Sequence, residues 1–295
     1  MRSRMNVCMK FFLVAGVSFA GFVYGYEVDR LASGLKGVAG VIMQEEYIGD
    51  KDENNTRYWG GIKYTFVSGG PKNVALYIKR GDMMQQGAQA VVDAANIKLV
   101  SGGGVTGVLQ AAVQEYVDDN NITYKNFIDD IWRKDKKNGL DGIGIAWLNT
   151  NKNVRVQYGK NVMQIIHAHG PQCSNGTITK QQKIELGQSY VTSLQEAEKG
   201  KVTSIAFPFI SSDIYGCGFY ESVQVIVDAV LSYLLKNQNV KLDALDIVLY
   251  QSDSTINETS LERQGWFVKA VRSWAESVGE IKKDPAVDVK IFNKK

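Results

Sequence analysis

The sequence has few residues of the kinds that build metal centres or disulfide frameworks: it contains 3 cysteines and 2 histidines in 295 residues. One cysteine, Cys8, lies in the amino-terminal segment, so only Cys173 and Cys217 remain for the rest of the chain. In an oxidising compartment these two can form at most one disulfide, and two free buried thiols fit the sequence equally well. The chain also contains no internal repeat and no low-complexity tract.

The sequence also lacks an excess of charge once its first residues are set aside. The whole chain has 34 basic and 31 acidic side chains, and 3 of the basic ones, Arg2, Arg4 and Lys10, precede residue 11. Removing these 3 leaves 31 basic against 31 acidic side chains, so the net charge does not favour nucleic acid as a partner.

The amino-terminal segment, residues 1–25, has the pattern of a secretory signal peptide. A basic start is followed by the apolar run 11–23 and then by small residues. The run is short and interrupted by glycine, which argues against a membrane span, although an uncleaved anchor is the alternative. Cleavage is expected after Gly25, or alternatively after Ala20. The sequence therefore predicts a secreted or periplasmic protein without a stable membrane anchor.

The rest of the chain divides into an extension, one domain and a tail. Residues 26–71 show no sustained hydrophobic period and are interpreted as an N-terminal extension. Short apolar runs begin near residue 72, so we assign residues 72–283 to one domain and residues 284–295 to a C-terminal tail. We expect a monomer.

Six short apolar runs in this domain are typical of buried β-strands, and helical patterns lie between several of them. The runs are VALYIK, AQAVVDAA, GIGIAWL, VMQIIHA, TSIAFPF and LDIVLY. Apolar residues at helical spacing within 105–116, and again within 223–234, each form one helix face. Strands that alternate with helices predict a mostly parallel sheet covered on both faces, with ligands at the carboxyl ends of the strands.

Three consecutive glycines, Gly102 to Gly104, lie between one of these strands and the helical pattern that begins at Val105. Glycine permits the positive φ angles and the close backbone approach that a phosphate needs, and we expect an unusual φ at Gly103. The N-terminus of a helix adds unpaired N–H groups and positive potential. The loop matches neither GxxxxGK[ST] nor GxGxxG, so it predicts an anion site of another kind, with a tight structural connection as the alternative.

Four motifs, in order along the chain, resemble those of macro domains, which bind ADP-ribose. VVDAANIKLVSGGGV resembles the family's VNAAN…GGGV signature. The segment from Lys79 to Met83 is similar to its upstream GDI segment, IIHAHGP to its HTVGP strand end, and SIAFPFISSDIYG to its AFPxIStGiyG segment. The resemblance covers residues 74–275 and implies an α/β fold, a three-layer α/β/α macro domain with a mixed, mostly parallel central sheet.

The resemblance implies a role toward ADP-ribose, free or attached to protein, for each matching residue. Asp82, supported by the Met83 backbone, would accept a hydrogen bond from the adenine amino group, and Tyr250 would stack on adenine. Asn96 would hold hydroxyls of the distal ribose and is also a candidate catalytic residue. Two phosphate loops would supply the other contacts, from Gly102, Gly103, Gly104 and Val105 and from Ser211, Ser212, Asp213, Ile214, Tyr215 and Gly216.

Several of these residues also have a purely structural interpretation. Asp82 could cap a turn with Gly81, Asn96 could close a turn within its own loop, and Tyr250 could belong to the core. Their joint placement is what favours a binding cleft.

Three residues depart from the macro-domain pattern. Thr106 stands where many hydrolytic members have an aspartate that helps to activate water, and a threonine hydroxyl is too weakly acidic to act as a general base near neutral pH. Asp213 stands where the family usually has glycine, and it either faces outward or replaces the missing base. Asp93 replaces the first asparagine of the signature. The resemblance thus implies binding of ADP-ribose and leaves open whether mono-ADP-ribosyl or O-acetyl-ADP-ribose bonds are hydrolysed.

Two other functions fit parts of the sequence. Gln114 and Glu115 after the glycines resemble the QEE signature of poly(ADP-ribose) glycohydrolases, with Glu115 as the acid, but Tyr116 occupies the third position. A macro fold that has lost nucleotide binding and acts only as an interaction domain is the other alternative.

Neither a metal nor another cofactor is expected. His167, His169 and Cys173 have a spacing that is compatible with a metal site, but the first histidine matches a position that is also histidine in the family without metal. The expected partner is ADP-ribose or ADP-ribosylated protein, and no nucleic acid.

Overall fold

The computed structural model describes residues 41–48, 58–71, 74–100, 102–119, 140–150, 154–158, 161–212, 214–250 and 258–292. Among them the strands are β1 (Val41–Tyr47), β2 (Tyr58–Ser68), β3 (Ala75–Gly81), β4 (Ala90–Ala94), β5 (Ile145–Leu148), β6 (Arg155–Tyr158), β7 (Asn161–His169), β8 (Ser204–Phe207), β9 (Ala244–Tyr250) and β10 (Gly279–Lys282). The helices are the 3-10 helix η2 (Met83–Gln85), α2 (Gly104–Asp119), α4 (Lys180–Lys199), α5 (Phe219–Lys236), α6 (Glu258–Val278) and α7 (Pro285–Ile291).

The described strands form one mixed sheet in the order β10-β1-β2-β3-β9-β8-β4-β7-β5, with β6 paired to β7. Its central strands β3, β9, β8, β4 and β7 run parallel to one another. The antiparallel pairs lie toward the two edges, where β2 joins β1 and β3, and where β5 and β6 join β7. The predicted mixed, mostly parallel sheet is therefore confirmed for the centre of the domain.

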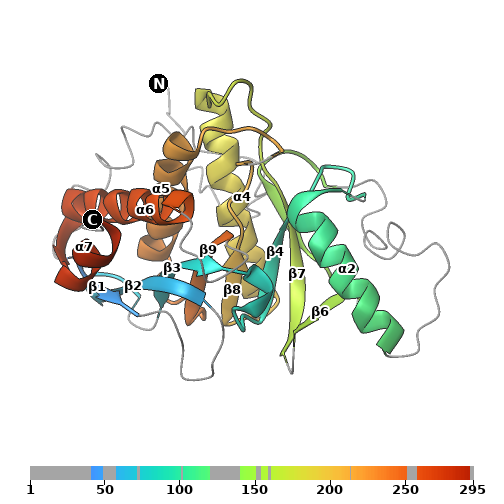
Figure 1. The fold of residues 1–295 in the computed structure, drawn as a ribbon, viewed down its shortest axis with the longest axis horizontal. Helices are drawn as coiled ribbons and strands as arrows, with labels where there is room; N and C mark the ends of the chain where they lie inside the picture. The colour runs from blue at the N-terminus through green and yellow to red at the C-terminus, as the bar shows by residue number, and fades with distance from the viewer. Residues whose placement is uncertain are drawn as a thin grey trace, which may run out of the picture.

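Helices cover both faces of this sheet because successive side chains of a central strand point to opposite sides. On β4, Val92 belongs to the core shared with α4, α5 and α6, whereas Val91 belongs to the core shared with α2. Ile166 and Ile165 of β7 divide in the same way. Figure 1 shows α4, α5 and α6 gathered on one side of β4 and β7 and α2 on the other. The fold has the three predicted layers.

All six apolar runs predicted as strands are strands, namely β3, β4, β5, β7, β8 and β9. The helix face predicted within 223–234 is fully buried on α5. On α2 the buried face is narrower than predicted, because Leu109 and Val113 are buried while Val108 is 56% exposed. None of the described helices is both long and apolar enough to cross a membrane. The predicted signal peptide, residues 1–25, lies outside the described residues.

Residues 41–68, interpreted from the sequence as part of an extension, contribute β1 and β2 to the same sheet as β3. Alternate side chains of β2, at Ile62, Tyr64 and Phe66, are buried in the core beneath α6. At the other end of the chain, residues assigned to a tail form α7, and Val287 of this helix is buried in the same core. β1, β2 and α7 are therefore integral to the packing of the domain.

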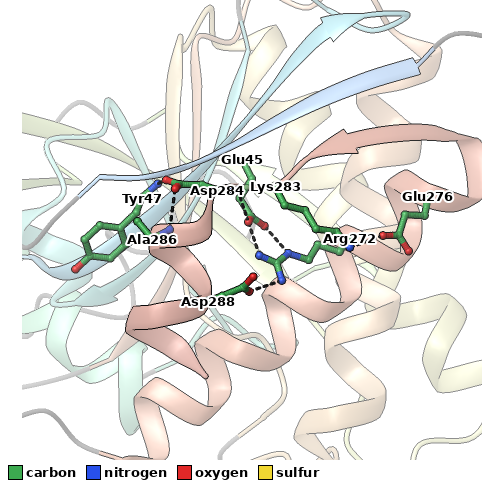
Figure 2. Close-up of polar contacts among 8 residues, drawn as sticks. All are labelled: Glu45, Tyr47, Arg272, Glu276, Lys283, Asp284, Ala286 and Asp288. Atoms are coloured by element: carbon green, nitrogen blue, oxygen red, sulfur yellow. Dashed lines mark hydrogen bonds and ion pairs between the residues drawn. The ribbon is translucent and has the colours of Figure 1, made fainter. Parts of the chain in front are cut away.

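A partly buried ion-pair network joins β1 to α6 and α7 (Figure 2). Arg272 of α6 donates from Nε to Glu45 of β1 at 2.9 Å and from Nη1 to Asp288 of α7 at 2.7 Å. The Glu45 side chain is fully buried and that of Arg272 is 13% exposed. Beside it, the carboxylate of Asp284, the N-cap of α7, accepts a hydrogen bond from the backbone N–H of Tyr47 at 2.8 Å.

This network governs the protonation of its central cation. Burial alone lowers the pKa of Arg272, but the hydrogen bonds and charges of Glu45 and Asp288 raise it, and the net pKa lies above the usual arginine value. The guanidinium therefore stays charged, and it neutralises a carboxylate that would otherwise be buried alone, which is costly in a protein interior.

We expect Arg272→Met to lower the free energy of unfolding by about 3–5 kcal/mol, because it leaves the buried Glu45 carboxylate without its cation. Urea unfolding measures the change. Lys283→Met is the matched control: Lys283 pairs with Glu276, and their side chains are 47% and 54% exposed, so its loss should cost less than about 1 kcal/mol. Equal losses for the two variants would contradict a structural role for the network.

Candidate functional site

The loops after β4 and β8 meet at the carboxyl edge of the sheet and enclose a cavity of about 220 Å³. The first loop and the start of α2 contribute residues 94–96 and 102–106, the second contributes residues 209–212, 214 and 215, and Gly170 follows β7. The two loops lie together because β4 and β8 are adjacent parallel strands, so their carboxyl ends meet at one edge.

The structure brings most of the predicted site residues into this lining. From the first loop these are Asn96, Gly102, Gly103, Gly104 and Val105, and from the second they are Ser211, Ser212, Ile214 and Tyr215. Gly216 follows directly and has a positive φ of 63°. Asp213, a candidate ligand and catalytic residue, lies outside the described residues.

The residues predicted to bind adenine lie beside the cavity and not in its lining. Asp82 and Tyr250 are at the ends of the paired strands β3 and β9, where Gly81 is in register with Tyr250. Tyr250 is 74% exposed, so it does not belong to the core. Asp82 caps η2 by accepting a hydrogen bond from the Met84 backbone N–H at 2.9 Å, and Met83 is buried. Adenine recognition by these residues stays a prediction.

The glycines of the first loop serve two purposes that the sequence did not separate. The positive φ, +59°, belongs to Gly104, the first residue of α2, and not to Gly103 as predicted. At Gly103 the constraint is contact across the cavity, because an added Cβ would lie 3.3 Å from Cδ1 of Ile214 in the second loop. Glycine therefore permits a left-handed backbone conformation at Gly104 and close approach of the two loops at Gly103.

Asn96 closes its own loop. Its side-chain Nδ2 donates to the Val100 carbonyl at 2.7 Å, and its Oδ1 accepts from the Val100 backbone N–H at 3.2 Å. The interpretation that Asn96 closes a turn within its own loop is therefore correct. Asn96 nevertheless also lines the cavity, so a role toward a ligand stays a prediction.

The second loop holds a strained residue with a buried, unsatisfied hydroxyl. Ser211 has a φ of 66°, which is uncommon for a residue with a side chain, and it is 7% exposed. Its Oγ has no hydrogen-bond partner among the described residues. A Cβ at Gly170 would collide with this hydroxyl, so glycine is needed there. Ser211 lines the cavity, and backbone strain of this kind often occurs at functional sites.

A disulfide between Cys173 and Cys217 restrains the second loop. Cys173 and Cys217 are bonded, which decides between the two alternatives that the sequence left open. The Cys217 backbone N–H donates to the Ser211 carbonyl at 2.9 Å, and the Cys173 N–H donates to the Tyr215 carbonyl at 2.7 Å. The crosslink therefore holds both ends of the segment that lines the cavity.

A polar cluster lies beneath the first loop, around the fully buried Asp93 at the end of β4. Its Oδ1 accepts a hydrogen bond from the Thr106 hydroxyl at 2.6 Å, and its Oδ2 lies 2.8 Å from His167 Nδ1. The side-chain Nδ2 of Asn149 lies 3.1 Å from His167 Nε2, and Trp147 stacks on the imidazole. The sequence had marked Asp93 and Thr106 only as separate departures from a pattern.

Burial and the charge of Asp93 in this cluster both change the pKa of Tyr215. Burial raises the pKa of Tyr215, and the charge of Asp93 raises it further, so its hydroxyl stays protonated near neutral pH and can donate a hydrogen bond.

The residues weighed as metal ligands have other partners, since His169 Nδ1 lies 3.0 Å from the Ala95 carbonyl oxygen and Cys173 is in the disulfide. The described residues contain no group of three or more side chains suited to hold a metal.

Comparison with known proteins agrees with this geometry. The model of the macro domain family matches residues 147–226. An uncharacterized protein of Pyrococcus abyssi is 31% identical over 195 residues, which covers 63% of this chain and 97% of that protein. This chain belongs to the macro domain family. The resemblance seen in the four motifs is thereby confirmed.

Other relatives of this macro domain carry functional names. The ADP-ribose glycohydrolase of Archaeoglobus fulgidus is 29% identical over 182 residues, which covers 62% of this chain and 88% of that protein. Human ADP-ribose glycohydrolase MACROD2 is 28% identical over 193 residues, or 65% of this chain and 39% of that protein. The Oceanobacillus iheyensis macrodomain with ADP has a TM-score of 0.54 at 20% identity, covers 73% of this chain and 97% of its own, and confirms the fold.

We expect the double variant Cys173→Ala, Cys217→Ala to lower the free energy of unfolding by about 2–4 kcal/mol, because the crosslink restricts the unfolded chain across 44 residues. Chemical denaturation with and without reductant measures it. Reductant should destabilise the wild type and leave the variant unchanged, so a wild type that is insensitive to reductant would contradict the disulfide.

Proposed function

We propose that this macro domain binds ADP-ribose, free or attached to protein, in the cavity between its two loops, and that it hydrolyses mono-ADP-ribosyl or O-acetyl-ADP-ribose bonds. The observation that carries the proposal is the cavity in which Ser211, held in a left-handed backbone conformation, lies with the glycine loop at the start of α2. The names of the Archaeoglobus and human relatives support it, since both are ADP-ribose glycohydrolases.

The chemistry of the lining suits a diphosphate. Gly104 opens α2, so the first N–H groups of this helix have no partner within the helix and lie at the cavity wall. The helix dipole adds positive potential at the same place, and an anion is favoured there. Ile214 of the second loop lies near Gly103 and Gly104, so the second loop would face a bound phosphate from the other side of the cavity.

The position of the cavity suggests how a larger ligand would lie. A volume of about 220 Å³ is smaller than the usual range for a ligand pocket, so this cavity would hold only part of ADP-ribose. In the strand order β3-β9-β8-β4, the ends of β3 and β4 are three strand spacings apart, about 14 Å. Adenine would therefore extend along the sheet edge toward Asp82 and the exposed ring of Tyr250.

Two measurements test the proposal. Calorimetric titration with ADP-ribose should show saturable binding with one site, and incubation with mono-ADP-ribosylated protein should release ADP-ribose. Absence of binding would leave only the interaction-domain alternative. A poly(ADP-ribose) glycohydrolase with Glu115 as its acid is not favoured, because the part of α2 that lines the cavity is residues 104–106 and Glu115 lies about three turns farther along the helix.

We also propose that the mature protein acts in a secreted or periplasmic location. The signal-peptide pattern of residues 1–25 supports this, and so does the disulfide, since structural disulfides persist in oxidising compartments. Amino-terminal sequencing of the exported protein tests it, with Tyr26 or Gly21 expected as the first residue. An intact amino terminus on protein retained in the reducing cytosol would contradict it.

We expect Gly104→Ala to weaken ADP-ribose binding at least about tenfold, or roughly 1.4 kcal/mol. The added methyl strains a left-handed backbone and enters the cavity wall beside Ile214. Gly87→Ala is the matched control, since Gly87 has a similar φ of +70° but lies before β4, at the opposite edge of the sheet. Both variants should lose similar stability, and only Gly104→Ala should lose affinity in calorimetry.

A further inference from the structure

Two of the three residues that depart from the macro-domain pattern, Thr106 and Asp93, are hydrogen-bonded to each other. Thr106 lines the cavity, and its hydroxyl donates a hydrogen bond to Asp93 Oδ1 at 2.6 Å. Asp93 is fully buried at the end of β4, directly behind Thr106. The carboxylate absent from position 106 is therefore present one hydrogen bond farther from the cavity.

The surroundings keep this carboxylate in place. Its second oxygen, Oδ2, lies 2.8 Å from His167 Nδ1 on the adjacent parallel strand β7, where Asp93 and His167 are in register. With the Asn149 Nδ2 amide donating to His167 Nε2, the imidazole carries its proton on Nδ1 and donates it to Asp93. Asp93 thus accepts from His167 on one side and from Thr106 on the other, and Thr106 keeps lone pairs for a group in the cavity.

We propose that Thr106 and Asp93 form a proton relay that activates water in the cavity. This inference rests on the proposed function and adds a base to it. A threonine hydroxyl alone is too weak a base, but a hydroxyl that passes its own proton to a carboxylate can accept one from water in the same step. Thr106 contacts the water, and Asp93 acts through Thr106 as a positioning residue and the final proton acceptor.

The step balances for an ADP-ribosyl group joined to a carboxylate side chain. The oxygen of the water forms a bond to C1 of the distal ribose, and the bond from that carbon to the carboxylate oxygen breaks. The leaving carboxylate takes the bonding electron pair and needs no proton. One proton of the water moves to Thr106 Oγ1, and the Thr106 proton moves to Asp93 Oδ1. After the product leaves, the proton returns from Asp93 to Thr106, and Thr106 releases one to water in the cavity, which restores the starting state.

Three single variants test the relay with a labelled protein that carries mono-ADP-ribose on carboxylate side chains. Thr106→Val keeps the shape of the side chain and removes the hydroxyl, Asp93→Asn keeps the shape and removes the base, and Thr106→Ser keeps the hydroxyl. Release of ADP-ribose under single-turnover conditions gives the rate, calorimetry with ADP-ribose gives the affinity, and thermal unfolding checks the fold.

We expect Thr106→Val and Asp93→Asn to slow release at least about 100-fold, the usual effect of losing a general base, while the affinity changes less than about threefold. Thr106→Ser should retain the rate within about fivefold. A purely structural role would instead change affinity and stability together and would not be rescued by serine. If Asp93→Asn fails to fold, the comparison of valine with serine at position 106 still decides.

Failure of the relay can be distinguished from failure of the proposed function. Wild-type protein that binds no ADP-ribose overturns both. Wild type that binds but releases nothing overturns the relay and leaves binding intact. Wild type that releases ADP-ribose while Thr106→Val releases it equally fast also overturns the relay, and it shows that hydrolysis proceeds by another route.

Discussion

Parallel pairing of β3, β9, β8, β4 and β7 is the constraint on which the cavity and its surroundings depend. The carboxyl ends of adjacent parallel strands lie at the same edge of the sheet. This pairing alone therefore brings the loops after β4 and β8 to the same edge as the ends of β3 and β9. The same pairing aligns Asp93 on β4 with His167 on β7. It also requires that both faces be covered, which explains why adjacent residues of one strand belong to different cores.

The central strands could be predicted from the sequence because each is a short apolar run that is buried on both faces. The outer strands were missed for a different reason. β2 shows the alternation of a half-buried strand, since Ile62, Tyr64 and Phe66 are buried. β1 depends on partners that are far away in the sequence, because its Val41 pairs with Gly279. A local pattern cannot reveal such pairing, nor can it place Glu45 against Arg272.

In the site, too, features that are local in the chain could be predicted from the sequence, and contacts between distant residues could not. The loop that runs from Asn96 to Gly104 could be found because its spacing is continuous in the chain. The contact between Thr106 and Asp93 joins residues 13 apart, and it depends on which way two side chains turn at a strand end and a helix start. Likewise, the positive φ proved to belong to Gly104, one residue from its expected place, because the helix begins there.

The pairing of β1 with β10 has a consequence for the order in which the domain can assemble. β1 is made early, but its partner strand, its ionic partner Arg272 and the helix that caps its end all come from residues 272–291. Contacts of such long range close slowly, and until they form, the edge of β1 remains unpaired. During synthesis β1 therefore waits for the last tenth of the chain before its pairing is complete.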